Sequence, residues 1–298
     1  MTAGPALDIS TILRVPSERF RMQRLEEELG LREGIVPAAL ENSALVTPTY
    51  QIAHDAFLLT LPNGLRFHYR RGSGTVYARP AEVSDAEVTL FFEGSVYGAI
   101  AWINGLVPLH ASAVVHAGRV HAFTGASGAG KSTLVAALAE RGFVAFSDDV
   151  VVLDPSDPAQ IVAIPGPKRL KLWSDALTLT SQQSSNRVRP GLDKFYVGES
   201  LFAARTPLPI ERLYFLESAG NHPAEIVRIC GTQRFKQLQS AYYRPHFCAA
   251  LAEQGAYFRT ITQLAHGIAM ARFHRPRDIA RFAEVADLIA ADLGAGRD

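Results

Sequence analysis

A glycine-rich run in the middle of the chain has the residue types and spacing that hold phosphate groups. Residues 125–132, Gly-Ala-Ser-Gly-Ala-Gly-Lys-Ser, match the pattern G-x-x-x-x-G-K-[ST] in full. Glycines let successive backbone N–H groups point inward at phosphate oxygens, and a following helix adds its positive end. Lys131 is a cation for the β- and γ-phosphates, and the Ser132 hydroxyl is a ligand for Mg²⁺. The predicted nucleotide-binding residues are Gly125, Ala126, Ser127, Gly128, Ala129, Gly130, Lys131, Ser132 and Thr133.

Two absent motifs narrow the choice of nucleotide and of protein class. The sequence has no LSGGQ-type signature, which transporter ATPases carry. It also has no N-K-x-D motif, which reads guanine. We therefore predict ATP as the nucleotide, with Mg²⁺ as its metal.

An acidic pair, Asp148-Asp149, follows the apolar strand expected at 142–147, 17 and 18 residues after Lys131. That strand should run parallel to the strand before the loop, so the pair should lie at the same edge as the phosphates. Neighbouring strand residues point to opposite faces, so both reach one site only if the chain turns there. One carboxylate could then hold Mg²⁺ while the other accepts the proton of an attacking hydroxyl.

Phosphoryl transfer spreads negative charge over three oxygens, so a further cation is expected at the site. Lys194 is the favoured candidate, because a polar loop with glycine and proline precedes it and could act as a lid. Arg244 and Arg259 are weaker candidates, on or beside the C-terminal helices. The remaining candidates are Lys168, Arg169, Lys171, Arg187 and Arg189.

The elements around the loop predict an α/β fold. A strand at 119–124 enters the loop, and a helix at 132–141 and a strand at 142–147 follow, which makes a strand–helix–strand unit with a right-handed crossover. A hairpin partner at 109–115 precedes it across the turn at 116–118. Further strands are expected at 150–155, 161–165, 210–217 and 224–229, and helices at 232–242, 245–253 and 278–293.

The first part of the chain reads as a separate small α+β domain, at 1–93, before the P-loop domain at 94–298. A helix is expected at 17–30, and the Asn63-Gly64 turn predicts a hairpin of 57–61 with 65–71. Two more strands are expected, at 75–80 and 87–93, followed by a buried helix at 95–103.

Composition and charge limit the partners and the compartment. Lys and Arg number 30 against 29 Asp and Glu, a net charge of +1, which argues against a disordered polyelectrolyte and a nucleic-acid partner. Cys230 and Cys248 lack the spacing of a metal site and fit a reducing cytoplasm. The uncharged stretch 94–118 is broken by an Asn-Gly pair and a proline, so we expect no membrane span. We also expect no signal peptide.

Three features together carry a family resemblance. His110, the loop at 125–132 and Ser-Asp-Asp-Val-Val-Val-Leu at 147–153 resemble the catalytic domain of HPr kinase/phosphorylase, a bacterial enzyme that phosphorylates a serine on a small carrier protein. The resemblance is strong over 109–155 and loose over 160–260. The arrangement looks closer to divergent HPr kinase-like proteins of peptide natural-product clusters. Some of those are serine kinases of precursor peptides, including lasso peptides.

The resemblance implies an ATP-dependent serine kinase of the P-loop, HPr kinase-like type, with a peptide or small-protein acceptor and a homo-oligomeric assembly. Asp148 then matches the general base, and His110 matches a histidine that interacts with that base. Asp149 matches the second carboxylate near the metal, and Ser132 matches the magnesium ligand. The implied catalytic set is Asp148, His110, Lys131 and Lys194. The family's phosphorylase signature loop has no match in this sequence, so the reverse reaction and the carrier protein HPr are not implied.

Two other functions stay open. Shikimate, gluconate and adenylylsulfate kinases also place acidic residues after the strand that follows the loop helix, which makes a small-molecule kinase the main alternative. Those proteins usually begin with the loop strand and carry an arginine-rich lid, whereas here more than a hundred residues precede the loop. A nucleotide-binding module without catalysis is the third possibility. The extra N-terminal residues are where we expect acceptor recognition.

Overall fold

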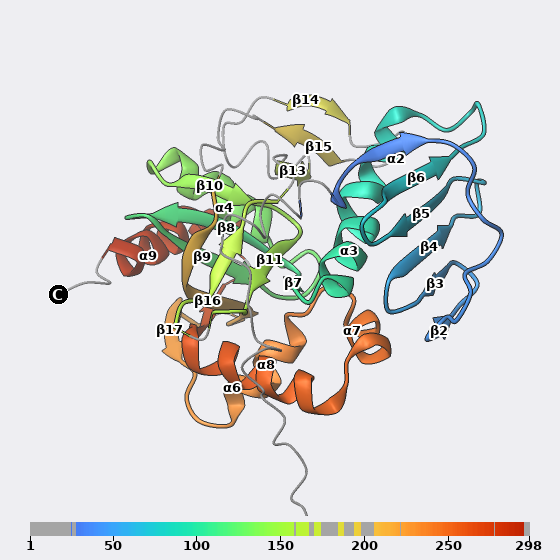
Figure 1. Cartoon of the computed structure of the whole chain (residues 1–298). Helices are drawn as coiled ribbons and strands as arrows, with labels where there is room; N and C mark the ends of the chain where they lie inside the picture. Colours follow the sequence, from blue (N-terminus) through green and yellow to red (C-terminus); the bar gives the residue numbers. More distant parts are fainter. Residues whose placement is uncertain are drawn as a thin grey trace, which may run out of the picture.

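The computed structural model describes residues 25, 28–157, 159–166, 206–220, 222–276 and 278–294, and the backbone alone of 170–173, 184–187 and 194–197. The described strands form a six-stranded, a nine-stranded and a three-stranded sheet, with helices between and around the two larger sheets (Figure 1). The fold is mixed α/β, which confirms the predicted class. Of the helix predicted at 17–30, Leu25, Glu28, Leu29 and Gly30 are described, and Leu25 and Glu28 are helical.

The N-terminal sheet contains the predicted hairpin. Strands β4 (Ala56–Thr60) and β5 (Arg66–Arg70) pair antiparallel across the Asn63-Gly64 turn. Gly64 has a φ of 85° there, which favours glycine, and the Asn63 side-chain oxygen accepts a hydrogen bond from the Leu65 amide at 3.2 Å. The sheet order is β1 (Leu31–Glu33), β6 (Gly74–Ala78), β5, β4, β3 (Tyr50–Ile52), β2 (Leu45–Val46).

Residues 85–103 form one helical run, so the strand predicted at 87–93 was wrong. The run consists of α2 (Asp85–Phe91), a π-helical turn (Phe92–Val96) and α3 (Tyr97–Ile103). Its start is fixed by Ser84, whose hydroxyl accepts a hydrogen bond from the Glu87 amide, and by acidic residues in the first turn. These end effects outweigh the β-branched and aromatic residues that suggested a strand. The helix predicted at 95–103 is confirmed.

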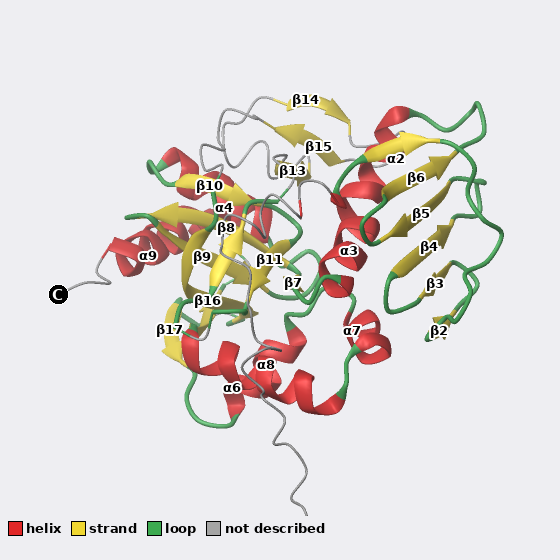
Figure 2. Ribbon diagram, in the orientation of Figure 1, coloured by secondary structure: helices red, strands yellow, loops and turns green. Residues whose placement is uncertain are grey.

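Helix α3 lies between the two large sheets (Figures 1 and 2). One apolar cluster contains Phe57 from β4, Ile100 from α3, Val152 from strand β11 (Val151–Asp154) and Phe247 from helix α7 (Pro245–Leu251). The N-terminal sheet is therefore packed onto the rest of the chain through a shared core. The expected domain boundary at residue 93 lies inside the helical run, and the division into two domains stays a prediction.

The nine-stranded sheet contains the predicted loop strand and its hairpin partner. Strand β9 (Arg119–Thr124) pairs antiparallel with β8 (Ala111–His116), and β8 pairs antiparallel with β10 (Val144–Ser147). Strands β9 and β10 therefore run in the same direction, as predicted, with β8 between them. The order is completed by β16 (Leu208–Ser218), β12 (Val162–Ile164), β11 and β7 (Val107–Leu109), while β18 (Ala269–Arg275) and β17 (Glu225–Arg228) extend it from β16.

Five further helices are described, and the sequence predicted four of them. These are α4 (Lys131–Glu140), α6 (Gln233–Ser240), α7 and α9 (Phe282–Gly294). Helix α8 (Gln254–Gly267) and strand β18 were missed, because no element was predicted between residues 253 and 278. Strand β18 pairs parallel with β16, so it is held by its neighbours in the sheet rather than by a local signal.

A buried histidine lies in the middle of β9. His121 is 6% exposed, and its Nδ1 has no hydrogen-bond partner among the described residues. Burial lowers the pKa of the His121 imidazole to about 4, and the nearby charge of Arg212 adds to this. The ordinary histidine pKa is about 6.5, so between these values the unfolded chain binds the proton and the folded chain does not.

We therefore expect the protein to lose stability as the pH falls from 6.5 towards 4. A pKa of about 4 in place of 6.5 corresponds to a loss of roughly 3 kcal/mol in the free energy of unfolding from His121 alone. His121→Gln should remove this part of the pH dependence of the free energy of unfolding in urea titrations. His222→Gln, at an exposed position, is the control and should leave the pH dependence as it is. Equal acid sensitivity of His121→Gln and the wild type would contradict the assignment.

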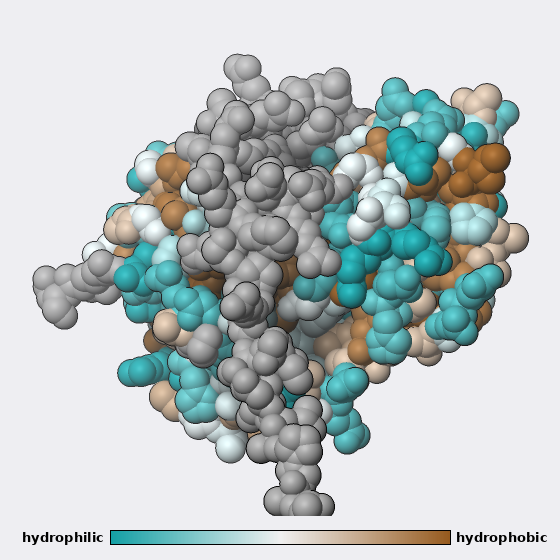
Figure 3. Space-filling model, viewed as in Figure 1, coloured by the Kyte–Doolittle hydropathy of each residue, from teal (hydrophilic) through white to brown (hydrophobic). Residues whose placement is uncertain are grey.

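No helix among the described residues is long and apolar enough to cross a membrane. On the face shown in Figure 3, hydrophilic residues are interspersed with smaller hydrophobic patches over the N-terminal sheet. Within the N-terminal sheet and its loops, Ile35 and Val46 are the most exposed large apolar side chains, and they lie in or beside the short edge strands.

Candidate active site

Four strands end at one edge of the nine-stranded sheet, and predicted site residues follow two of them, β9 and β10. Phe215 of β16 pairs with Thr124, the last residue of β9, and Ser218 of β16 pairs with Arg275, the last residue of β18. Strand β10 ends at Ser147, immediately before the acidic pair. Chain topology thus gathers the loop, Asp148 and Asp149, and the end of β18 at this edge.

The glycine-rich run connects β9 to α4, as the motif requires. Gly130 is the N-cap of α4 and has a φ of 79°, the left-handed conformation that favours glycine. At Gly125, whose φ is 152°, a Cβ atom would lie 2.9 Å from the carbonyl oxygen of Leu216. Both glycines are thus required by the backbone path, and the positive end of α4 faces the loop.

Lys131 is folded back over the loop. Its side chain is almost wholly buried, at 7% exposed, and its Nζ donates to the carbonyl oxygens of Gly125 at 3.0 Å and Ala126 at 3.2 Å. The ammonium group is therefore held across the backbone that would surround a phosphate. A cation in this place can move to phosphate oxygens by exchanging carbonyl acceptors for them.

Asp148 joins three elements around the loop. Its Oδ1 accepts a hydrogen bond from the Ser132 hydroxyl of α4 at 2.7 Å and another from the Ser112 hydroxyl of β8 at 2.6 Å. The Asp148 side chain is buried, at 6% exposed. Ser112, which lies on β8 beside the loop strand β9, was not predicted from the sequence.

The Asp149 carboxylate lies beside His110. The chain turns at this residue, whose φ is 69°, and the amide of Val150 donates to the carbonyl oxygen of Asp148 at 2.9 Å. His110 Nδ1 lies 3.1 Å from the Asp149 carbonyl oxygen and 3.5 Å from its carboxylate Oδ1. A non-glycine residue with positive φ is uncommon and is often found at functional sites.

His110 is held firmly beside the loop. Its amide donates to the carbonyl oxygen of Ala241 at 2.7 Å, and its own carbonyl oxygen accepts from the Thr124 hydroxyl at 2.8 Å. Burial lowers the pKa of the imidazole below its usual range, and the charge of Lys131 lowers it further, while Asp149 opposes both. At neutral pH the ring is uncharged. With Nδ1–H directed at the Asp149 carbonyl, Nε2 keeps its lone pair.

A cavity of about 600 Å³ adjoins the loop. Its walls include the loop itself, the end of β16, and the side of the chain that leads from β18 into α9. Arg275 lies against the loop, because a Cβ atom on Gly130 would be 3.2 Å from its Nη2. Arg275 was not among the predicted cations, since the strand that ends at it was not recognised. Its position at the end of β18 supplies a second positive charge beside Lys131.

The favoured additional cation, Lys194, begins strand β15 (Lys194–Val197), but its side chain lies outside the described residues. The same holds for the side chains of Lys168, Arg169, Lys171, Arg187 and Arg189. Arg244 Nη2 donates to the Ser95 hydroxyl at 2.6 Å, and its guanidinium lies 5.6 Å from the Tyr243 ring, whose centroid is 6.0 Å from that of His110. Arg259 lies in the middle of α8. The structure therefore brings together the loop, Asp148, Asp149 and His110 from the predicted set.

Comparison with known proteins finds a likeness among solved structures. No protein-family model matches the chain, and no curated protein matches it in sequence. Among solved structures, the chain is similar to the Hpr(Ser) kinase/phosphatase from Coxiella burnetii, with 16% sequence identity and a TM-score of 0.37, over 64% of this chain and 90% of that chain. A TM-score this low gives no weight to the likeness, so the function has to be inferred from the chain's own residues.

Proposed function

We propose that the protein is an ATP-dependent serine kinase that transfers the γ-phosphate to a hydroxyl group of a peptide or small protein in the cytoplasm. The observation that carries the proposal is the contact of Asp148 with Ser132 at 2.7 Å, beside Lys131 at the loop. A phosphate-binding loop alone binds nucleotide, whereas a carboxylate at its mouth adds a group that phosphoryl transfer needs.

The described residues suit ATP. The loop amides and Lys131 would hold the β- and γ-phosphates, and Arg275 adds positive charge on the side of the 600 Å³ cavity. That cavity has room for the nucleoside, because ligand pockets of drug-sized molecules span roughly 300–1,000 Å³. Phe282 of α9 lines it and offers a ring against a base.

The oxygen donors at the loop suit Mg²⁺. The hydroxyl of Ser132 and the carboxylate of Asp148 are hard ligands that already lie 2.7 Å apart. Mg²⁺ usually takes one or two protein oxygens and completes its shell with waters and phosphates. When bound, Mg²⁺ would neutralise charge that develops on the phosphate oxygens. We therefore propose Asp148 rather than Asp149 as the metal-side carboxylate, because only Asp148 contacts Ser132.

The second carboxylate is then available for the proton. The acceptor hydroxyl oxygen bonds to the γ-phosphorus, the bond from phosphorus to the β–γ bridging oxygen breaks, and ADP leaves. We propose that Asp149 and His110 take up the hydroxyl proton as a pair, with the ring oriented by its 3.1 Å contact to the Asp149 carbonyl. This arrangement exchanges the roles that the family resemblance implied for the two aspartates.

The pair predicts a pH dependence. Because the pKa of His110 lies below its ordinary value, the ring loses its proton at a lower pH than a free histidine and stays neutral above it. The rate of a single turnover should fall on the acid side with a midpoint below about 6.5 and should be level above it. His110→Gln should lower the rate and remove this acid limb. An unchanged profile in that variant would contradict the role of His110.

The acceptor class is tested by labelling. ATP labelled in its γ-phosphate is incubated with the protein, Mg²⁺ and two sets of acceptors, serine-containing peptides and small hydroxyl metabolites. The proposal predicts label on a peptide serine, whereas label on a metabolite would favour a small-molecule kinase. A precursor peptide, as of lasso peptides, is the first acceptor to include. The homo-oligomer implied by the resemblance is tested separately by size-exclusion chromatography with light scattering.

A further inference from the structure

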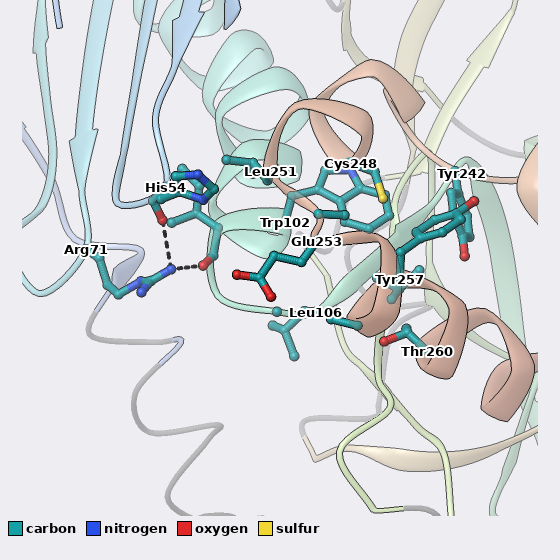
Figure 4. Close-up of a pocket in the computed structure, with 15 residues that line it drawn as sticks. His54, Arg71, Trp102, Leu106, Tyr242, Cys248, Leu251, Glu253, Tyr257 and Thr260 are labelled. Atoms are coloured by element: carbon teal, nitrogen blue, oxygen red, sulfur yellow. Dashed lines mark hydrogen bonds between the residues drawn. The ribbon is translucent and has the colours of Figure 1, made fainter. Parts of the chain in front are cut away.

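A second cavity lies away from the loop, where the N-terminal sheet, α3 and the α7–α8 pair meet (Figure 4). Its volume is about 330 Å³, within the range of small-ligand pockets. A water takes about 30 Å³ of liquid, so the space corresponds to roughly ten waters or a molecule of about a dozen heavy atoms. Its walls come from parts of the chain that are far apart in sequence, from His54 to Thr260.

The body of the cavity is apolar and aromatic. The side chains of Trp102, Leu106 and Leu251 line it together with those of Tyr242 and Tyr257. Trp102 and Tyr242 lie edge to face, with ring centroids 5.3 Å apart. Trp102 is fixed further by its Nε1, which donates to the carbonyl oxygen of Tyr243 at 2.9 Å. The aromatic wall is therefore already formed and needs no rearrangement to receive an apolar group.

Two opposite charges line the same cavity. Arg71 enters from the N-terminal sheet, and its Nη2 donates to the carbonyl oxygen of His54 at 3.0 Å and also to that of Ile103. Glu253 enters from the start of α8, where its side chain makes no capping hydrogen bond. Both side chains reach into the opening in Figure 4. Within the described part of the chain, neither is in an ion pair with any residue, including each other.

From this arrangement we infer that the cavity binds a free α-amino acid with a large apolar side chain. Its carboxylate would pair with Arg71, its ammonium group with Glu253, and its side chain would lie against Trp102 and Tyr257. A phosphate or another simple anion fits less well, because the Glu253 carboxylate would repel it. A residue within a peptide lacks both charges, and a peptide terminus has one of them. The inference does not depend on the kinase function.

The ligand class can be tested by titration calorimetry of the whole protein without ATP. The ligands are L-phenylalanine, L-leucine and two blocked forms, N-acetyl-L-phenylalanine and L-phenylalanine amide. We expect at least one free amino acid to bind at millimolar concentration or below. Both blocked phenylalanines should bind with about tenfold lower affinity than free phenylalanine. Absence of binding by both free amino acids, or equal binding of a blocked form, would overturn the proposal.

A matched pair of variants tests the site itself. Glu253→Gln keeps the size of an exposed side chain and removes its charge, and should weaken amino-acid binding about tenfold. Glu82→Gln makes the same change at another exposed position and should bind like the wild type. Quenching of Trp102 fluorescence by the ligand would place binding in this cavity. We expect the quenching to be lost in Trp102→Phe. An unchanged affinity in Glu253→Gln would overturn the assignment of the ammonium partner.

Discussion

Replacing Lys131 with alanine should lower the rate of phosphoryl transfer by about 100-fold or more, since one lost electrostatic contact at the transition state is worth roughly 3–4 kcal/mol. The structure gives the reason, because the Lys131 ammonium is the cation held directly across the loop, 3.0 Å from the Gly125 carbonyl. ATP binding should weaken as well, because the same charge faces the β- and γ-phosphates in the ground state. Single-turnover transfer and equilibrium binding of ATP separate the two effects.

The control is Lys236→Ala, which removes the same charge from an exposed position on α6. It should transfer phosphate at the wild-type rate. The thermal unfolding midpoint of both variants shows whether Lys131→Ala is folded, because that substitution also removes two hydrogen bonds to the loop backbone. A folded Lys131→Ala protein with unchanged single-turnover transfer would contradict the role given to the loop.

Replacing the two aspartates one at a time should give two different defects. Asp148→Asn should lower the transfer rate about 100- to 1,000-fold and raise the Mg²⁺ concentration needed for half-maximal rate, because it removes the charge beside Ser132. Asp149→Asn should lower the rate about 100-fold or more with the Mg²⁺ requirement unchanged, because it removes a carboxylate that helps to take up the proton of the acceptor hydroxyl. Rates measured across a Mg²⁺ titration distinguish the two.

Both substitutions are mild for the fold. An asparagine at 148 keeps an oxygen that can accept from Ser112 and Ser132. ATP should therefore still bind to each variant. If Asp149→Asn changed the Mg²⁺ requirement and Asp148→Asn did not, the roles would be those implied by the family resemblance rather than those proposed from the contacts. Full activity of Asp148→Asn would contradict any catalytic role for that residue.

The sequence predicts those parts of the site that have a local signal. The loop spacing locates Gly125 to Ser132, and the direction of β10 follows from the helix before it, so the acidic pair could be placed at the loop edge. Which aspartate faces which partner could not be predicted. That depends on the positive φ of Asp149, which turns one carboxylate towards Ser132 and the other towards His110.

The features missed from the sequence depend on packing between distant segments. Arg275 reaches the loop because β18 pairs with β16, and the local sequence of β18 gave no strand signal that was recognised. The helix at 85–91 was mistaken for a strand because of its β-branched and aromatic residues, although Ser84 provides a helix cap. The second cavity joins His54 to Thr260, and no motif relates residues so far apart.

Transfer of the γ-phosphate of ATP to a peptide serine is the central claim, and one measurement tests it most directly. The protein is incubated with γ-labelled ATP, Mg²⁺ and the peptides encoded beside its gene, and the products are analysed by mass spectrometry. The predicted result is a peptide that gains one phosphate on a serine with the wild-type protein and not with Lys131→Ala. Tight ATP binding with label only on a small metabolite, or with no transfer to any acceptor, would contradict the claim.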